Sequence, residues 1–286
     1  MKRATSIALG LCGIWLAYTQ IPPKPPILSL NKVKEDLYQI TGHGGNVAVY
    51  VTAEGVILVD DKFEIDHDTI VQIVKSVTNQ PIRYVVSTHY HDDHSGGNAG
   101  FIGSTEIIST AKARHNILKH KQPGVTVNLV PARITFSEEC SLFLGGKEVR
   151  AVFLGRGHTD GDAVIYFPEH RTIHTGDLMA GETPNLNYTV IDYAGGGSIV
   201  AWVRTLDDVL KMDFETVIPG HGKITNKAGL LAYRDTLDKL RSRTTSMVRA
   251  GASQDDVEKM VTAEFGWKRG GQNFQFSFPG LIEELR

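Results

Sequence analysis

The sequence predicts a layered α/β fold, and three observations support this prediction. Short apolar runs bounded by turn residues indicate strands, and they are interspersed with segments whose apolar residues recur at helical spacing. The chain has 286 residues, of which 41% are hydrophobic, which is sufficient for a core and excludes disorder over most of the chain. Mixed strands with interspersed helices bury their apolar faces by packing in layers. We therefore expect helices packed on mixed sheets.

The first half of the chain is predicted to contain four strands and two helices. Residues 66–77 are expected to form a helix, because Ile70, Ile73 and Val74 recur at helical spacing after an acidic first turn. Residues 111–119 form the second predicted helix. The strands are expected at 37–40, 46–52, 56–59 and 82–87.

The second half begins with further strands and ends in helices. Apolar runs predict strands at 134–136, 141–144, 149–154, 162–167, 171–174 and 216–218. Ser198 is expected to cap a helix whose apolar residues share one face. From residue 227 onward an apolar stripe continues to Met247, and another helix is predicted at 253–265. We therefore expect one domain over 31–286, including a C-terminal helical extension over 227–286.

The N-terminus has the pattern of an export signal. Two basic residues precede an apolar segment over 7–18, which is too short to span a bilayer comfortably. A Pro-rich spacer over 21–30 follows. We expect residues 1–20 to be a signal peptide, with an uncleaved membrane anchor as the alternative. The protein is thus expected to be exported, periplasmic or secreted, and to contact a membrane only if the segment is retained.

The charge balance argues against nucleic acid as a partner. The chain carries 30 Lys and Arg against 32 Asp and Glu, a net charge of −2 that becomes −4 once the basic residues of the leader are removed. Binding to a phosphate backbone needs a concentrated basic surface. We therefore expect a small-molecule substrate and no nucleic-acid partner, and the sequence carries no signal for the oligomeric state.

Four candidate metal ligands lie within six residues, directly after the strand predicted at 82–87. They are His89, His91, Asp93 and His94. Imidazole nitrogens combined with carboxylate oxygens suit zinc, and they also tolerate iron or manganese. Such a run of histidines also occurs by accident on protein surfaces. The position at a strand end favours the metal site, because the chain can turn several side chains there toward one point.

Three more candidate ligands lie just past other predicted strands, each in a Gly-flanked loop. His158 follows the strand at 149–154, Asp177 follows the strand at 171–174, and His221 follows the strand at 216–218. Ligand sites in α/β sheets gather at such strand ends. The sequence therefore predicts one metal centre built from several loops.

This ordered set of ligands, His-x-His-x-Asp-His followed by His, Asp and His, resembles the metallo-β-lactamase superfamily over about residues 37–222. The resemblance implies a four-layer αββα sandwich. It also implies that two metal ions are bound, with Asp177 bridging them. His89, His91 and His158 would bind one ion, and Asp93, His94 and His221 would bind the other.

One residue departs from the pattern of the well-studied β-lactamases, and this narrows the choice of subfamily. The well-studied β-lactamases of the superfamily have a cysteine at the position of Asp177, often with a lysine three residues later, where this chain has Ala180. In this respect the chain is similar to glyoxalase II and acyl-homoserine lactonases. Asp162 departs from glyoxalase II, which usually has histidine there, and the surrounding residues are similar to the β-lactamases. The sequence therefore lies between subfamilies.

The expected function is a di-zinc hydrolase that uses a metal-bound hydroxide on a carbonyl substrate, namely a β-lactam, lactone, ester or thioester. Asp93 is expected to bind its ion and to orient the nucleophile. Two alternatives have the same ligand set: a non-haem iron persulfide dioxygenase and a phosphodiesterase of this fold. A metal-holding protein without enzymatic activity is a further alternative, which seven intact ligands disfavour.

Four other residues are candidates for roles beside the ligands. Asp60 is expected either to accept a hydrogen bond from a ligand histidine or to stabilise a turn. His43 lies in a glycine-rich loop that, in this fold, can overhang the site. Tyr188 and Tyr193 lie in the long loop after Asp177, where either would donate to a substrate oxyanion or be an ordinary surface tyrosine.

Overall fold

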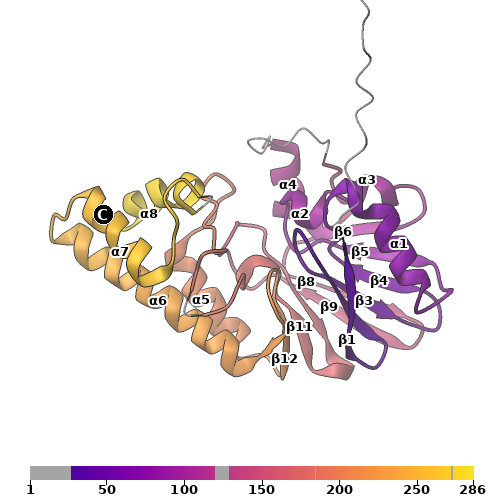
Figure 1. Ribbon diagram of the computed structural model, residues 1–286. Coiled ribbons are helices and arrows are strands. Elements are labelled where there is room, and N and C mark those ends of the chain that lie inside the picture. The colour runs from indigo at the N-terminus through magenta and orange to yellow at the C-terminus, as the bar shows by residue number, and fades with distance from the viewer. Residues whose placement is uncertain (1–26, 120–128, 184, 272) are drawn as a thin grey trace, which may run out of the picture.

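Two mixed sheets form the centre of the fold in this computed structural model (Figure 1), which describes residues 27–119, 129–183, 185–271 and 273–286. The first sheet has seven strands in chain order, antiparallel from β1 to β4 and parallel from β4 to β7. Its strands are β1 (Ser29–Lys34), β2 (Leu37–Thr41), β3 (Val47–Val51), β4 (Val56–Val59), β5 (Ile82–Val86), β6 (Glu106–Thr110) and β7 (Ile134–Phe136).

The second sheet has six strands in the order β13-β12-β11-β10-β9-β8. Only the pair of β11 and β12 is parallel, and every other neighbouring pair is antiparallel. Its strands are β8 (Glu139–Leu144), β9 (Lys147–Val152), β10 (Val164–Phe167), β11 (Thr172–His174), β12 (Thr216–Ile218) and β13 (Thr225–Asn226).

Helices cover the outer faces of both sheets, which gives the predicted four-layer αββα sandwich. The inner cluster joins residues of both sheets, such as Tyr50 and Ile57 with Ile165 and Phe167. The helices are α1 (His67–Lys75), α2 (Asp92–Ser95), α3 (Asn98–Phe101), α4 (Ala111–Lys119), α5 (Ile199–Val209), α6 (Lys227–Arg249), α7 (Gln254–Phe265) and α8 (Phe278–Glu284). A second cluster packs the other face of the first sheet against α1 and α3, and a third packs the second sheet against α5, α6, α7 and α8.

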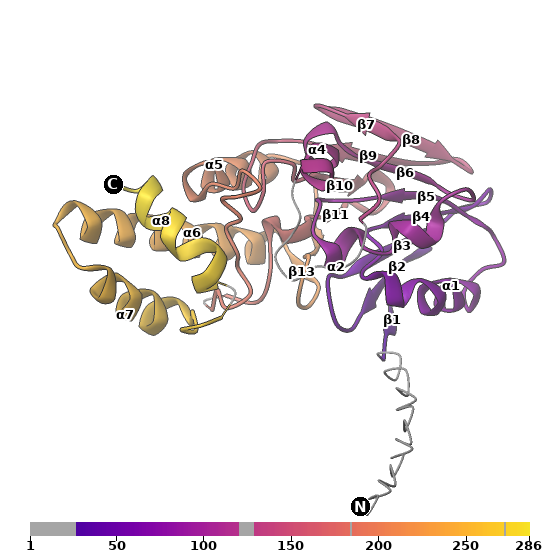
Figure 2. The ribbon, with the colours of Figure 1, turned by 90° about the horizontal axis from the view of Figure 1, so that it is seen from above.

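The helices α6, α7 and α8 form a lobe to one side of the sheets (Figure 2). Each of the helices α5, α6 and α7 is capped by a side chain that accepts a backbone hydrogen bond: Ser198 from Ala201, Asn226 from Gly229, and Ser253 from Asp256. The expected cap at Ser198 is therefore confirmed. A single π-helical turn, Asn273–Ser277, leads into α8.

The structure also contains elements that the pattern of residues did not indicate. Strand β6 ends in Ser109 and Thr110, which are buried although they are polar, so this strand has no simple apolar run. Strand β1 begins at Ser29, inside the expected spacer, and none of its residues is buried. The expected signal peptide at 1–20 lies outside the described residues.

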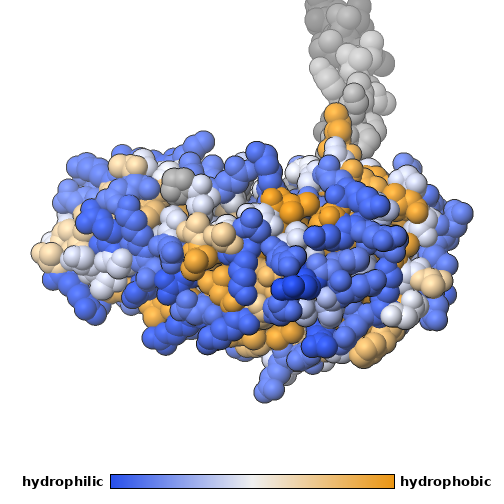
Figure 3. Space-filling model, turned by 90° about the horizontal axis from the view of Figure 1, so that it is seen from below, coloured by the Kyte–Doolittle hydropathy of each residue, from blue (hydrophilic) through white to orange (hydrophobic). Residues whose placement is uncertain are grey.

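Hydrophilic side chains cover most of the face in Figure 3, with apolar side chains in small groups between them. Within the described parts of the chain, no helix combines the length and apolar character needed to cross a bilayer.

Candidate metal centre

The seven predicted ligands lie together at one end of the two sheets. Those from the first sheet follow the C-terminal end of β5: His89 and His91 lie in the connecting loop, and Asp93 and His94 lie in α2. Those from the second sheet lie in three separate loops, at His158, Asp177 and His221. Four of the seven residues thus lie together because they are close in sequence. The packing of the two sheets brings the other three residues to them.

The first group consists of three histidines, His89, His91 and His158. Nδ1 of His91 lies 3.2 Å from Nε2 of His89 and 2.8 Å from Nε2 of His158. A tetrahedral zinc ion with bonds of about 2.1 Å has ligand atoms about 3.4 Å apart. The three nitrogens therefore have about the spacing of three corners of such a site.

The second group consists of Asp93, His94 and His221. Nε2 of His221 lies 3.3 Å from Nε2 of His94 and 3.2 Å from Oδ2 of Asp93. The carboxylate of Asp177 faces both groups: Oδ1 lies 3.2 Å from Nε2 of His94, and Oδ2 lies 3.7 Å from Nε2 of His158. This position suits a ligand shared by two ions.

The buried oxygen Oδ1 of Asp177 supports a cation between these groups. It accepts no hydrogen bond of acceptable geometry, although His94 and His221 lie 3.2 and 3.4 Å away. Buried carboxylate oxygens are normally paired or coordinate a metal. The nitrogen and oxygen donor set, the spacings and this oxygen without a hydrogen bond all fit zinc ions.

Neighbouring glycines make room for the ligands. A Cβ atom on Gly220 would lie 2.0 Å from Oδ1 of Asp177, and one on Gly45 would lie 2.3 Å from the ring of His94. Any larger residue at either position would have to displace a ligand. The glycines beside the ligands thus have a steric role that is separate from flexibility.

Asp60 accepts a hydrogen bond from one ligand directly and reaches another through Thr88. Nδ1 of His94 lies 2.7 Å from Oδ2 of Asp60. The backbone N–H and the hydroxyl of Thr88 also donate to Asp60, and Nδ1 of His89 lies 3.1 Å from the Thr88 hydroxyl oxygen. These contacts turn Nε2 of both histidines toward the centre. Of the two roles expected for Asp60, the structure favours the hydrogen bond to a ligand.

Two further partners of the ligands had no signal in the sequence. Oδ2 of Asp192 lies 3.0 Å from Nε2 of His91 and also accepts a hydrogen bond from the hydroxyl of Tyr90. Nδ1 of His158 lies 2.7 Å from the carbonyl oxygen of Val190. Asp192 is separated from His91 by about 100 residues, and Val190 contributes only backbone, so neither has a recognisable spacing.

Burial and mutual charge set the protonation of the ligands. Burial lowers the pKa of His158 to about 4, so its ring is neutral at neutral pH. Burial opposes a charge on His221, but Asp177 and Asp93 outweigh it and raise its pKa to about 9. Burial also disfavours ionisation of Asp93, yet His94 and His221 hold its pKa below the usual range. The imidazoles of the second group therefore hold protons beside Asp93 and Asp177, and a cation would compete with these protons.

Of the remaining candidates, the structure places Tyr188 beside the centre and turns the other two to different partners. The ring of Tyr188 stacks on His221, and the residue is 59% exposed. The imidazole of His43 stacks on Phe63, and its Nε2 lies 3.1 Å from Asp66.

Tyr193 is a correction to the expected role in substrate binding. Its hydroxyl donates to Glu284 of α8 at 2.8 Å, and burial together with Glu284 raises its pKa. The packing of α8, far along the chain, sets this direction.

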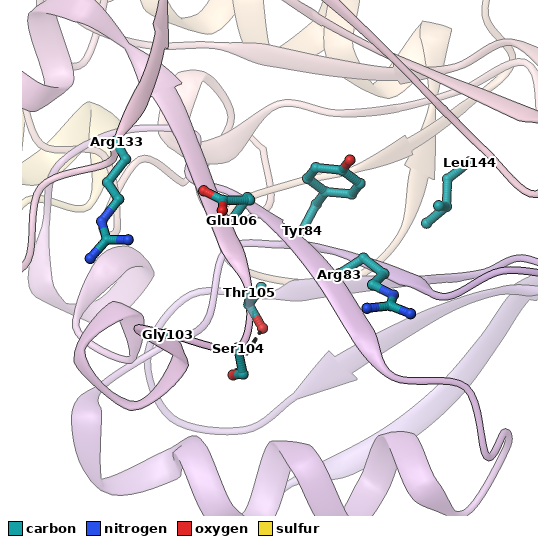
Figure 4. Close-up of a pocket in the computed structure, with 8 residues that line it drawn as sticks. All are labelled: Arg83, Tyr84, Gly103, Ser104, Thr105, Glu106, Arg133 and Leu144. Carbon is teal, nitrogen blue, oxygen red and sulfur yellow. Dashed lines mark hydrogen bonds between the residues drawn. The ribbon is translucent and has the colours of Figure 1, made fainter.

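A cavity of about 390 Å³ lies near the opposite ends of the parallel strands (Figure 4). Arg83 and Tyr84 lie near the start of β5, and Glu106 is the first residue of β6. The ligands follow the other end of β5, so this cavity is separate from the metal centre.

Fold and side chains together define a class of protein, an α/β sandwich with His and Asp groups that could hold metal ions at the ends of its strands. Residues 40–221 match the family model of the metallo-beta-lactamase superfamily. The chain therefore belongs to this superfamily and is a hydrolase of it, as its resemblance implied.

Named relatives agree with this assignment. Metallo-beta-lactamase IND-1 of Chryseobacterium indologenes is 27% identical over 184 residues, which cover 63% of this chain and 72% of the relative. Metallo-beta-lactamase type 2 of Elizabethkingia meningoseptica is 26% identical over 255 residues, which cover 83% of this chain and 93% of the relative. A solved metallo-beta-lactamase from Pontibacter korlensis shares the fold, with a TM-score of 0.64 and 20% identity over 74% of this chain and 99% of that one.

Proposed function

We propose that this chain binds two zinc ions and hydrolyses a small substrate that carries a carbonyl group, namely a β-lactam, lactone, ester or thioester. The observation that carries the proposal is the pair of ligand groups with the carboxylate of Asp177 between them. Iron or manganese would fit similar donors, so metal analysis is part of the test.

The residues of the second group suit a substrate that approaches from solvent. The side chains of Asp93 and His221 are 23% and 21% exposed, whereas His94 is fully buried. When bound, two zinc ions supply a hydroxide nucleophile at neutral pH and polarise the substrate carbonyl. The Asp93 carboxylate would orient the attacking oxygen and accept its proton, which then passes to the leaving nitrogen or oxygen.

Tyr188 is the substrate contact that we propose. Its exposed ring lies parallel to that of His221, with the two ring centroids 6.3 Å apart. A phenolic hydroxyl at the mouth of the centre would donate a hydrogen bond to a carboxylate or carbonyl oxygen of the substrate.

The names of the relatives support β-lactams as the first substrates to try. Asp177, in place of the cysteine of the well-studied β-lactamases, favours the broader range of lactones, esters and thioesters. Both groups are small organic molecules, in keeping with the near-neutral net charge of −2.

Metal analysis followed by a substrate panel tests the proposal. Purified protein should hold two zinc ions per chain and turn over at least one of the β-lactams, lactones, esters or thioesters. The variant His91→Ala should lose metal and activity, while His115→Ala, at an exposed position outside the centre, should keep both. One iron per chain with oxidation of persulfides, or turnover of phosphodiesters alone, would contradict the proposal.

We further propose that the enzyme is exported, in keeping with the basic and apolar pattern of residues 1–20. The mass of the protein recovered from the periplasm or the medium would test this. A mature chain beginning near residue 20 is expected, whereas a full-length membrane-bound protein would support the anchor instead.

A further inference from the structure

The loop over residues 186–198 lies between the metal centre and the C-terminal helices, and it contacts both. On one side, the carbonyl of Val190 and the carboxylate of Asp192 bind the outer nitrogens of His158 and His91. On the other side, the loop is bonded to α6, α7, the π-helical turn and α8. Its partners there are Tyr233, Phe265, Ser277 and Glu284.

A single peptide group transmits one of these contacts. The carbonyl of Val190 faces Nδ1 of His158 at 2.7 Å, while the N–H of the next residue, Ile191, donates to Oγ of Ser277 at 2.8 Å. A trans peptide is planar, and its C=O and N–H point in opposite directions. The hydroxyl of Ser277, which is fully buried, therefore fixes the direction of the carbonyl that orients His158.

Glu284 holds the other part of the loop. Its carboxylate accepts hydrogen bonds from the hydroxyls of Tyr193 and Ser198 and from the backbone N–H of Ile199. Tyr193 directly follows Asp192, the partner of His91. The ring of Tyr193 fits against α8 at Gly280, where an added Cβ would lie 2.2 Å from the ring. This close fit restricts how far Asp192 is able to move.

We propose that Ser277 and Glu284 are positioning residues for the three-histidine group, and that the C-terminal helices set the affinity of that group for its ion. The proposal rests on the metal ligands assigned under the proposed function. The family model ends at residue 221, before α6, so Ser277 and Glu284 lie in the part of the chain outside that model. Two of the three histidines in the group depend on it, whereas His94 of the second group is held by Asp60.

The test compares Ser277→Ala and Glu284→Gln with two matched controls. Thr244→Val removes a buried hydroxyl of α6 that makes no hydrogen bond, and Glu283→Gln changes the exposed neighbour of Glu284. Zinc affinity is measured by competition with a chelator. Each test variant should bind one of its two ions about tenfold more weakly than wild type, and each control should match wild type.

Cobalt-substituted protein supplies a second readout that a purely structural role would not change. The exchangeable ring N–H protons of cobalt-bound histidines give strongly shifted proton resonances. In Ser277→Ala and Glu284→Gln, the resonances of His158 and His91 should move, while that of His94 stays in place. Tyr193→Phe, which loses only one hydrogen bond to Glu284, takes the place of Glu284→Gln if that variant fails to fold.

The outcomes separate this proposal from the proposed function. Wild-type protein that binds no metal overturns both. Wild-type protein that binds two ions, with test variants whose affinities and resonances equal those of the controls, overturns the role of the C-terminal helices alone.

Discussion

Replacing Asp60 with asparagine should weaken the binding of one metal ion about 10- to 100-fold. Oδ1 of Asp60 accepts a hydrogen bond from the backbone of Thr88, and Oδ2 accepts from the Thr88 hydroxyl and from Nδ1 of His94. Asparagine has one oxygen, so its NH₂ group must face one of these donors. Each lost hydrogen bond to a charged group costs about 1.5–3 kcal/mol, which corresponds to the expected range of affinity.

The tautomer of His94 gives the physical reason for the effect. With an NH₂ group opposite Nδ1, the neutral ring prefers to carry its proton on Nε2, the nitrogen that faces Asp177 and His221. A protonated Nε2 is unable to bind a metal, so the loss should fall on the second group.

Chelator competition at fixed pH measures this effect, and Asp61→Asn is the control. The carboxyl of Asp61 is buried without a hydrogen bond, and burial raises its pKa well above the usual value. An amide therefore resembles the group that it replaces. If Asp60→Asn binds both ions as tightly as Asp61→Asn does, the reasoning about His94 is wrong.

Three other predictions concern His221 and two residues near it, Gly220 and Tyr188. Gly220→Ala should release an ion, because its Cβ would lie 2.0 Å from Asp177; metal content near two ions per chain would contradict this. Tyr188→Phe should raise KM about two- to thirteenfold with unchanged metal content, from the loss of one hydrogen bond worth about 0.5–1.5 kcal/mol; steady-state kinetics with an unchanged KM would refute the contact. The raised pKa of His221, about 9 against 6.5, stabilises the metal-free fold below pH 6.5, and this stability should be lost as the pH rises through 9. Urea denaturation of metal-free protein at several pH values should show this fall, and His221→Gln should reduce it, while the raised pKa of His94 maintains the remainder.

Local patterns in the sequence singled out the residues that the structure brings together, because each pattern is short. Four ligands lie in one run of six residues, and the other three follow predicted strands within Gly-flanked loops. The same logic holds for the helices, since Ser198 caps α5 as expected. The chain's membership of the superfamily and its αββα layers agree with the resemblance.

The partners of the ligands were harder to predict, because tertiary packing selects them. Asp192 looks like any acidic loop residue until the second sheet brings it to His91. Val190 acts through its carbonyl, which every residue possesses. Tyr193 had the right residue type in the right loop, but its hydroxyl donates to Glu284 of the last helix. Strand β6 was missed for a related reason, since its Ser109 and Thr110 are buried by their neighbours despite being polar.

The two sheets contribute to each proposed ion, and this has a consequence for folding. One ion would join His91 of the first sheet to His158 of the second, and the other would join His94 to His221. These cross-links close loops of 67 and 127 residues, respectively. A cross-link that closes a long loop lowers the conformational entropy of the unfolded chain. In addition, an ion that binds only the native state stabilises it in proportion to the logarithm of the free ion concentration. The sandwich would thus be held together most firmly in compartments where zinc is plentiful, and zinc starvation would expose its chain to proteases.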